Sequence, residues 1–493
     1  MIVMKFGGSS LASATAIEWV AGVVKSHLAD QPVVVVSAMG KTTDRLMEAL
    51  QYAARGSAYS AWRRLEDLRQ YHFQETQRLL GGEAREFLDR HIAPKFRELH
   101  TILIELEEGK KLTPALQDEV LSYGERLSSQ IVAAGLEHAG IKAQHVDSGE
   151  VILTDDQFTC ATPLYLETYA QLRRSVALVA RHRTVVMGGF IGATREGTPT
   201  TLGGGGSDFT ASLVGAAICA RQVQIWTDVD GILSCDPRVL HGGYRLRSLG
   251  YDEAEELARS GAKVLCPKTV GPAIRQGIPI VIRNSRHPES EGTSIGPEAV
   301  RKPGVVKAIA CKAGMTVVHL VVPQTGILPG ITDGLNELFE RHQLHMEMVQ
   351  AQLDGVSFAV PSSPQLAELL RNVDDSARIH VEEHSGIITL VGEGITCQDS
   401  TMKRALSALL KNTGIRMVSQ GGARNSLRFA VPESKLTTAA ENLHREFFGT
   451  ADPEIFAATP ESSHSLLIAG MARDRAARLE SDSPVRPQLV PAR

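Results

Sequence analysis

The stretch Lys5-Phe6-Gly7-Gly8-Ser9-Ser10 begins at the last residue of a short strand-like run, Ile2–Lys5, and precedes a segment with helical spacing. A strand that turns directly into a helix is typical of α/β proteins with a parallel sheet. Two glycines at the turn let backbone N–H groups and the amino terminus of the helix approach an anion, for which phosphate is the natural candidate. A tight turn beside an incidental lysine explains the same residues, and the stretch alone does not separate the two interpretations.

The same alternation of strand and helix continues to about residue 300. Five more β-branched or apolar runs predict buried strands: Val33–Val36, Ala143–Val146, Thr184–Met187, Gln222–Thr227 and Ile278–Ile282. Helical patterns separate them, which predicts an α/β fold whose mainly parallel sheet is sandwiched by helices. The segment Tyr59–Glu108 is rich in Leu, Arg and Glu at helical spacing, and we expect a solvated helical hairpin there, without a chemical role.

A sequence repeat follows a Pro-, Ser- and Gly-containing stretch, His287–Pro303, which is typical of a linker. Two series of strand, helix, strand and strand begin at Gly314 and Gly386, and both close with Phe-Ala-Val-Pro, at 358–361 and 429–432. The predicted helices are Leu335–His342 and Met402–Leu410, and the strands after them contain Met348-Val349-Gln350 and Met417-Val418-Ser419-Gln420. Two small α+β modules are therefore expected, with little left to bury in the segment from about 452 onward.

Residues 200–211 read Thr-Thr-Leu-Gly-Gly-Gly-Gly-Ser-Asp-Phe-Thr-Ala and contain the most informative loop. Four consecutive glycines cost more chain entropy than a helix cap requires, so close contact with a polyphosphate is predicted. Ser207 and Asp208 also suit the cap of the following helix. Further along, Thr227-Asp228-Val229-Asp230 ends a strand, where polar residues of a parallel sheet face the ligand crevice. An Asx-type turn explains Asp228 and Asp230 equally well.

Two familiar phosphate motifs are absent, and two charged positions are weak signals. Ser37–Thr43 ends in Gly-Lys-Thr-Thr but has Val35 where a Walker A loop needs glycine, and no G-x-G-x-x-G follows a strand. Glu125 and Arg126 lie in an otherwise apolar helical pattern, where a surface ion pair is the simple explanation. Lys263, before a helix start, fits either a solvated charge or a phosphate ligand.

The composition narrows the class of protein. The 493 residues include 43% hydrophobic and 22% charged residues, as in globular proteins of about two to four domains. A formal charge of −4 provides no basic field for nucleic acid or an anionic membrane, so a small-molecule ligand is expected. The six cysteines form no C-x-x-C pair, and no apolar run reaches the length of a membrane span. We expect a cytoplasmic protein with no metal site built from its own residues.

Taken in order, these segments closely resemble those of the aspartate kinase (aspartokinase) family, which belongs to the amino acid kinases and carries C-terminal ACT domains. The segments that carry the resemblance are 5–10, Val36–Asp44, Ser122–Ser128, Gly188–Thr194, Thr201–Asp208, Trp226–Arg238 and Gly261–Pro267. The resemblance implies a catalytic domain at 1–300. It also implies a first ACT domain at 313–385, inserted into a second made of 303–312 and 386–450, and a flexible tail at 451–493.

The resemblance further implies the reaction of ATP and L-aspartate to ADP and 4-phospho-L-aspartate, the first step toward lysine, threonine and methionine, with Mg²⁺ bound to ATP. A carboxylate needs no general base to attack phosphorus, so the protein must chiefly align two anions and neutralise charge. The catalytic residues implied are Lys5 and Asp208. The ATP-binding residues implied are Lys5, Gly7, Gly8, Ser9, Thr227, Asp228, Leu233, Arg238, Lys263 and Val264, with N–H donors from Gly7, Gly8 and Ser9. The aspartate-binding residues implied are Ser37, Thr43, Glu125, Gly204, Gly205, Gly206 and Ser207, with Glu125 pairing with the ammonium group.

Some positions depart from the family pattern. Gly204 stands where the family usually has an arginine that grips a substrate carboxylate. A charge-assisted contact worth roughly 1.5–3 kcal/mol is then missing unless another cation, such as Arg126, supplies it. Leu233 and Cys266 replace a frequent tyrosine and histidine, which mainly alters nucleotide packing. Gln350-Ala351-Gln352-Leu353 stands where many lysine-sensitive members have Thr-Thr-Ser-Glu, so weak, altered or absent lysine feedback is expected.

The implied partners are ATP, L-aspartate, an amino-acid effector at the ACT domains, and further copies of the chain in a homodimer or homotetramer. The effector residues implied are Gln350, Gln352, Val418, Ser419 and Gln420. Two alternatives stay open. Gly204 motivates a kinase of a different amino-acid carboxylate, and the ACT repeats motivate a catalytically silent amino-acid sensor, which the complete set of phosphate-handling residues argues against.

Overall fold

The computed structural model describes residues 1–262, 267–321, 339, 344–352, 355–371, 378–410, 413–421 and 424–457. It divides into two compact units, which are described separately. The first consists of Met1–Ile232 and Arg247–Lys302, and the second of Leu233–Leu246 and Pro303–Arg493.

The first unit is built on an eight-stranded sheet with the strand order β3-β4-β2-β1-β7-β10-β11-β9. The strands are β1 (Ile2–Phe6), β2 (Pro32–Val36), β3 (Ala143–Val146), β4 (Thr184–Gly188), β7 (Val223–Thr227), β9 (Ser248–Leu249), β10 (Ile280–Asn284) and β11 (Thr293–Ile295). Neighbours pair in parallel except β10 and β11, which are antiparallel. All six predicted strands are present, and the predicted α/β fold is confirmed. The predicted linker is wrong in part, because β11 lies within it and extends the sheet.

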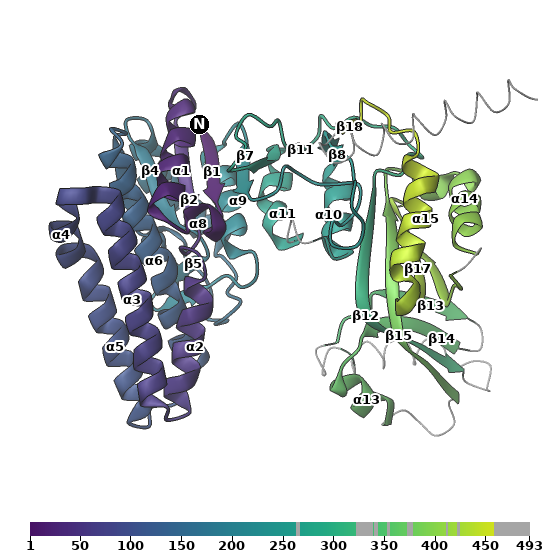
Figure 1. Cartoon of the computed structure of the whole chain (residues 1–493), viewed down its shortest axis with the longest axis horizontal. Coiled ribbons are helices and arrows are strands. Elements are labelled where there is room, and N and C mark those ends of the chain that lie inside the picture. Colours follow the sequence, from purple (N-terminus) through teal and green to yellow (C-terminus); the bar gives the residue numbers. More distant parts are fainter. Residues whose placement is uncertain are drawn as a thin grey trace, which may run out of the picture. The chain divides into compact units, whose positions relative to one another are not determined.

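Helices cover both faces of this sheet (Figure 1). They are α1 (Ala14–Ser26), α2 (Thr42–Ala54), α6 (Pro114–His138), α7 (Ser148–Val151), α8 (Tyr165–Ala180), α9 (Gly206–Ile218), α10 (Tyr251–Arg259) and α11 (Pro267–Arg275), with the hairpin β5 (Ile191–Ala193) and β6 (Pro199–Thr201) before α9. The alternation of side chains along β1 explains the two layers. Ile2, Met4 and Phe6 belong to one core with α1, α2 and α6, whereas Val3 faces Gly215 of α9 on the other side.

The helical excursion is packed rather than solvated, which corrects that prediction. It consists of α3 (Ala58–Leu80), α4 (Ala84–Phe87), a π-helical turn (Leu88–Ile92) and α5 (Ala93–Glu107), drawn in purple to blue in Figure 1. The apolar face of α3, with Leu65, Leu68 and Leu79, belongs to the same buried core as α1 and α6. Two polar residues of α3 also hold the loop before α1: Tyr71 donates its hydroxyl to the carbonyl of Ala12 (2.8 Å), and Glu75 accepts from the N–H of Ala14 (2.8 Å).

The second unit contains a six-stranded antiparallel sheet with the order β13-β14-β12-β15-β17-β16. Its strands are β12 (Ala308–Val321), β13 (Met348–Gln352), β14 (Gly355–Pro361), β15 (Arg378–Val391), β16 (Met417–Gln420) and β17 (Ser426–Pro432), and its helices are α13 (Pro364–Arg371), α14 (Asp399–Leu409) and α15 (Leu436–Phe448). The strands and the helix predicted at Met402–Leu410 are present. The helix predicted at Leu335–His342 lies outside the described residues except for residue 339. The α+β prediction for this half is confirmed.

The segment expected to begin the flexible tail is packed as far as residue 457, so the predicted boundary at 451 is wrong. Strand β18 (Phe456–Ala457) pairs with β8 (Arg245–Leu246), and Phe456 lies against Tyr244 and Phe448. Ile455, Phe456 and Ala457 are buried. The rest of the predicted tail, 458–493, lies outside the described residues.

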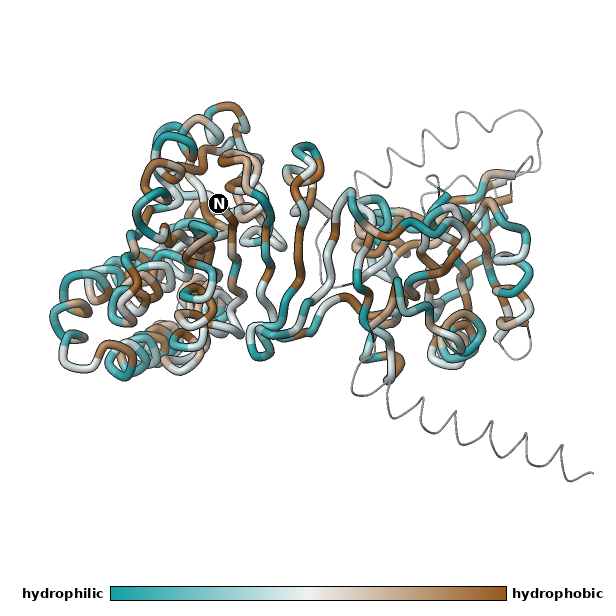
Figure 2. Tube along the Cα trace, turned by 90° about the horizontal axis from the view of Figure 1, so that it is seen from above, coloured by the Kyte–Doolittle hydropathy of each residue, from teal (hydrophilic) through white to brown (hydrophobic). Residues whose placement is uncertain are grey.

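Hydropathy follows the layers of each unit. Figure 2 shows hydrophobic stretches along the sheet strands and hydrophilic residues along outer helical faces. In the part of the chain that the structure describes, every helix is too short or too polar to cross a membrane.

Candidate active site

A pocket of about 450 Å³ lies in the first unit, where the parallel strands end. Its walls come from the end of β1, the loop after β2, the first half of α6, the turn at Thr159, the loop after β4 and the glycine run before α9. It brings together ten of the predicted site residues: Lys5, Gly8, Ser37, Thr43, Glu125, Gly204, Gly205, Gly206, Ser207 and Asp208. Residues from six separate segments therefore meet at the edge of the sheet where α/β proteins bind their ligands.

Lys5 and Asp208 form an ion pair inside this pocket. The distance from Lys5 Nζ to Asp208 Oδ1 is 2.6 Å, and the side chains are 11% and 16% exposed. Lys5 is held by β1, which pairs with strands on both sides, and Asp208 lies in the first turn of α9. A partly buried ammonium group that a carboxylate already orients is well placed to receive an anion such as a phosphate.

Glu125 is the second carboxylate of the pocket, and one of its oxygens has no partner. The side chain is 3% exposed, and Oε1 accepts a hydrogen bond from the N–H of Ala38 at 3.0 Å. Oε2 is buried without a hydrogen-bond partner among the described residues. Burial raises the pKa of Glu125 to about 8, because desolvation penalises the ionised form. A buried, ionised oxygen without a partner costs free energy, and a cationic group of a ligand removes that cost by pairing with it.

The loops at residues 7–10 and 37–43 approach each other closely. A Cβ at Gly8 would lie 2.8 Å from the carbonyl oxygen of Ala38, so a larger residue would force the loops apart. The N–H of Gly7 donates to the carbonyl of Trp226 at 3.2 Å, which corrects its predicted role as a phosphate donor. Gly8 and Ser9 begin the short 3-10 helix Gly8–Leu11, and they remain the candidate donors at this turn.

The four glycines of the run at 203–206 have different reasons to be glycine. Gly203 and Gly205 have φ values of +75° and +72°, in the left-handed region, and a Cβ at Gly206 would lie 2.6 Å from the ring of Phe190. Gly205, rather than Ser207 or Asp208, is the cap residue of α9, which corrects the predicted cap. Gly204 has no such constraint, because nothing lies within 4 Å of a Cβ built there. Structure therefore explains three of the glycines, and Gly204 is free to take a side chain.

None of the other predicted nucleotide residues that the structure describes lines this pocket. Thr227 ends β7 and Asp228 follows it, and the Thr227 hydroxyl donates to Asp228 at 3.2 Å. Leu233 and Arg238 belong to the second unit, and Arg238 pairs there with Asp236 at 2.5 Å. Ser9 lines a different pocket beside α1. Lys263 and Val264 lie outside the described residues, as does Cys266.

Asp230 has a structural role, which favours the turn interpretation for it. Its Oδ1 accepts from the amide of Asn284 at 2.7 Å. Arg126 is one cation that could have replaced the arginine missing at 204. It is not among the residues that line the pocket, and its guanidinium lies over the ring of Tyr123, so the structure does not support that role.

Sequence reasoning missed residues of α6 and of the loop at 157–162. Asp118 is fully buried and accepts from the N–H groups of Thr159 and Thr201, both at 2.8 Å, and from the Thr201 hydroxyl at 2.6 Å. Gln117, Leu121, Thr159 and Phe190 line the pocket. In the sequence, Gln117 and Asp118 look like ordinary surface positions in the first turns of a helix, so no signal pointed to them.

The predicted effector residues lie on the two end strands of the sheet in the second unit. Gln350 is exposed on β13, Val418 and Ser419 are half-buried on β16, and Gln420 is exposed there. Gln352 ends β13. The strands begin with Met348 and Met417, which share one buried cluster with Met315 and Ile387. The two predicted effector segments therefore start from the same core.

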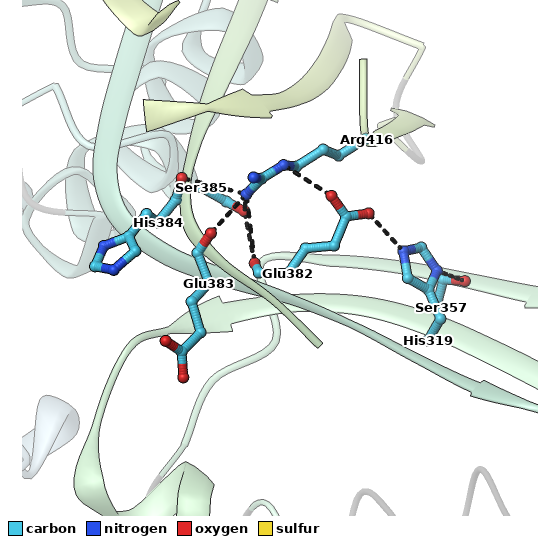
Figure 3. A network of polar contacts seen from close by, with 7 residues as sticks. All are labelled: His319, Ser357, Glu382, Glu383, His384, Ser385 and Arg416. Atoms are coloured by element: carbon cyan, nitrogen blue, oxygen red, sulfur yellow. Dashed lines mark hydrogen bonds and ion pairs between the residues drawn. The ribbon is translucent and has the colours of Figure 1, made fainter. Parts of the chain in front are cut away.

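A polar network crosses this sheet where β12 and β15 change register (Figure 3). The Glu382 carboxylate lies 3.3 Å from His319 Nε2 and 2.8 Å from Arg416 Nε. The Arg416 guanidinium also donates to the carbonyls of Glu383 (2.7 Å) and His384 (3.2 Å), and His384 has a φ of +52°. Arg416 thus satisfies the carbonyls that the irregularity in β15 takes out of the ladder.

Replacing Arg416 with methionine should loosen β15 locally. The freed carbonyls lose hydrogen bonds worth about 1–3 kcal/mol, so amide hydrogen exchange at 382–386 should accelerate roughly tenfold or more. Hydrogen exchange with mass spectrometry measures this change. Arg404→Met is the matched control, since Arg404 pairs with Glu446 at 2.7 Å on the surface of the same unit. Equal exchange at 382–386 in the Arg416 variant and the wild type would contradict the role of Arg416.

Among the described residues, no three His, Cys, Asp or Glu side chains cluster as they would to hold a metal ion. Asp208 is nevertheless a suitable ligand for a metal ion that enters the pocket bound to phosphates. Mg²⁺ in such a complex often takes only one or two carboxylates from the protein.

Comparison with known proteins agrees with this geometry. The sequence profile of the amino acid kinase family matches residues 1–284, and that of the ACT domain matches residues 388–447. Aspartokinase 1, chloroplastic, of Arabidopsis thaliana is 30% identical over 466 residues, which cover 91% of this chain and 80% of that protein. Lysine-sensitive aspartokinase 3 of Escherichia coli is 30% identical over 461 residues, covering 91% of this chain and 99% of the relative.

Solved structures of similar fold include E. coli aspartokinase III in two states. The complex with aspartate and ADP (R-state) superposes with a TM-score of 0.78 at 28% identity, covering 91% of this chain and 100% of that one. The complex with lysine and aspartate (T-state) superposes with a TM-score of 0.75 at 28% identity, covering 91% and 99%.

Proposed function

Because the chain belongs to the amino acid kinase family, as one of its aspartokinases, we propose that it transfers the γ-phosphoryl group of ATP to the side-chain carboxylate of L-aspartate. The products are ADP and 4-phospho-L-aspartate, and the reaction opens the route to lysine, threonine and methionine. One observation carries the proposal: the Lys5–Asp208 ion pair and the unpaired oxygen of Glu125 line the same pocket.

The pocket offers a partner for each charged group of the reaction. Lys5 neutralises charge on the transferred phosphoryl group, and the positive end of the α9 dipole, at Gly206–Asp208, lines the same pocket. Glu125 receives the ammonium group of aspartate. The attacking carboxylate is already ionised, so the residues align the two anions and need not remove a proton.

We propose Mg²⁺ as the metal that accompanies ATP. Asp208 would hold it together with the phosphates, and the metal would screen their charge when bound. Lys5 then keeps Asp208 oriented toward the phosphates through the 2.6 Å ion pair.

The proposal is tested by trapping the product with hydroxylamine. An acyl phosphate reacts to a hydroxamate, whereas phosphate esters do not. Aspartyl hydroxamate that forms only with ATP, L-aspartate and active protein together would support the proposal, and its absence despite ADP release would show that the acceptor is not a carboxylate.

We propose that the second unit is a pair of ACT domains that binds an amino-acid effector and joins copies of the chain into a homodimer or homotetramer. The first domain would comprise 313–385, inserted into a second made of 303–312 and 386–450. The ACT profile at 388–447 supports the second domain, and the register shift between Lys312 and Val317 lies next to the proposed boundary. The lysine complex of the E. coli relative supports an amino-acid effector.

We also propose a reducing cytoplasm as the location, since the cysteines described are free thiols.

A kinase of a different amino-acid carboxylate is the second candidate. Gly204 favours it, because a substrate carboxylate finds no arginine at that position. The silent sensor is less well supported, because the Lys5–Asp208 pair is formed.

Placing arginine at 204 should strengthen aspartate binding. Gly204 is exposed, its φ is not in the left-handed region, and a Cβ there meets nothing within 4 Å. An added guanidinium–carboxylate contact should lower the aspartate KM by about tenfold in Gly204→Arg. Steady-state kinetics measure the change. Gly82→Arg, at an equally open position outside the pocket, is the control. An unchanged or higher KM would mean that residue 204 does not face the substrate.

A further inference from the structure

One polar residue of the pocket has no assigned role. Gln117 lines the pocket from the first turns of α6, is half-buried, and has no side-chain partner among the described residues. Leu121 and Glu125 follow it at intervals of four residues and line the same pocket. One face of α6 therefore carries Glu125 and, about 12 Å further toward its amino terminus, a neutral amide.

Gln117 and Gly204 lie at the same end of the pocket. Asp118, the neighbour of Gln117, accepts from the N–H of Thr159 at 2.8 Å. A Cβ at Gly203, the neighbour of Gly204, would lie 3.3 Å from the carbonyl oxygen of Thr159. Thr159 has a φ of +71°, a strained conformation for a β-branched residue, and Asp118 holds it there. The turn at Thr159 thus joins the start of α6 to the glycine run.

Aspartate has three charged groups, and one of them still needs a binding partner at this end of the pocket. The side-chain carboxylate must lie near Lys5 for phosphoryl transfer, and the ammonium group pairs with Glu125. The α-carboxylate remains. Among the pocket residues that the structure describes, Lys5 is the single cation, and Asp208 already pairs with it. No second cation of the described pocket is left for the α-carboxylate, so a neutral hydrogen-bond donor is its expected partner, and Gln117 is the side-chain amide that lines this pocket.

We propose that Gln117 donates its side-chain amide to the α-carboxylate of bound aspartate and is a specificity-determining residue of this kinase. The inference rests on the proposed function. An amide donates hydrogen bonds without a net charge, so it recognises the carboxylate with less affinity than a guanidinium would. Glu125 and Gln117 then distinguish aspartate from acids that lack either α-substituent.

The test measures both binding and turnover with the full chain. Gln117→Ala should raise the aspartate KM, and the Kd from titration calorimetry in the presence of ADP, by about tenfold, with kcat and the ATP KM unchanged. Gln117→Glu should raise the aspartate KM and Kd further, because the introduced carboxylate would repel the α-carboxylate of aspartate. β-Alanine, which is aspartate without the α-carboxylate, should bind the wild type and Gln117→Ala equally. Gln130→Ala, the same substitution at a position of α6 that does not line the pocket, is the control.

The double variant sharpens the test. Because both side chains would bind the same carboxylate, Gln117→Ala should weaken aspartate binding less in the Gly204→Arg background than in the wild type, so that the two changes are not additive in the aspartate Kd. The role of Gln117 would be overturned if Gln117→Ala weakened the binding of aspartate and β-alanine equally, raised the ATP KM in parallel, or changed nothing. In each of these cases, turnover of aspartate by the wild type would still support the proposed function. A wild type that neither binds nor phosphorylates aspartate would overturn both.

Discussion

Replacing Lys5 with alanine should lower kcat for aspartate-dependent ADP release by about a thousandfold or more. Lys5 is the one cation among the described residues of the pocket, and its ammonium group lies 2.6 Å from Asp208. The variant loses the charge that meets the transferred phosphoryl group, and it leaves Asp208 to repel the phosphates. Steady-state kinetics measure the loss, and circular dichroism verifies that the fold is retained.

Lys25→Ala is the matched control, since Lys25 is exposed at the end of α1. It should leave kcat unchanged. Asp208→Ala should also abolish transfer, because it removes the group that orients Lys5. A folded Lys5 variant that turns over at a near-normal rate would remove Lys5 from the catalytic residues.

Replacing Glu125 with glutamine should raise the aspartate KM by about a hundredfold at pH 8, because a buried charge-assisted partner of the ammonium group is lost. The pH dependence gives the sharper signature. Since burial raises the pKa of Glu125 to about 8, the carboxyl is mostly protonated at lower pH and must release a proton to pair with the ammonium group. In the wild type, the aspartate KM should therefore fall roughly 50-fold from about pH 6 to pH 8 and level off above.

Glu125→Gln should show no such slope, because glutamine does not titrate. Glu119→Gln, a more exposed glutamate of the same helix, should keep the wild-type slope. A KM that is independent of pH in the wild type, or a slope that survives in Glu125→Gln, would show that another group receives the ammonium.

The same carboxyl affects folding stability with a defined sign. Its pKa in the folded state is above the value in an unfolded chain, so the folded state binds the proton more tightly. Its contribution to stability is therefore full at low pH and is lost as the pH rises toward about 8. A bound ammonium group should remove this loss, which makes stabilisation by aspartate greatest at alkaline pH.

Most of the fold could be predicted from the sequence, because buried parallel strands are continuous apolar runs that helical patterns separate. Six of the eight strands in the sheet of the first unit and the repeat of the second were visible for that reason. Two local predictions failed because burial by distant segments cannot be read from local composition. The polar face of α3 concealed a buried face, and Ile455–Ala457 became buried only by packing against a distant loop.

The site was predictable where chemistry and backbone geometry leave a pattern. Lys5, Asp208 and Glu125 were identified through the resemblance, and the structure brings all three to one pocket. Gln117 and Asp118 were missed because one polar residue in the first turns of a helix looks like any other. Their environment depends on the loop at Thr159, which lies about forty residues further along the chain.

The most direct test of the central claim is ADP release from the purified full chain with Mg·ATP and L-aspartate, followed in a pyruvate kinase and lactate dehydrogenase coupled assay, with L-glutamate and β-alanine in parallel. The account predicts release that depends on L-aspartate and is much weaker with the other two acids. No release with aspartate or any related acid, together with a melting temperature that lysine or threonine raises, would contradict it and would identify the chain as an amino-acid sensor.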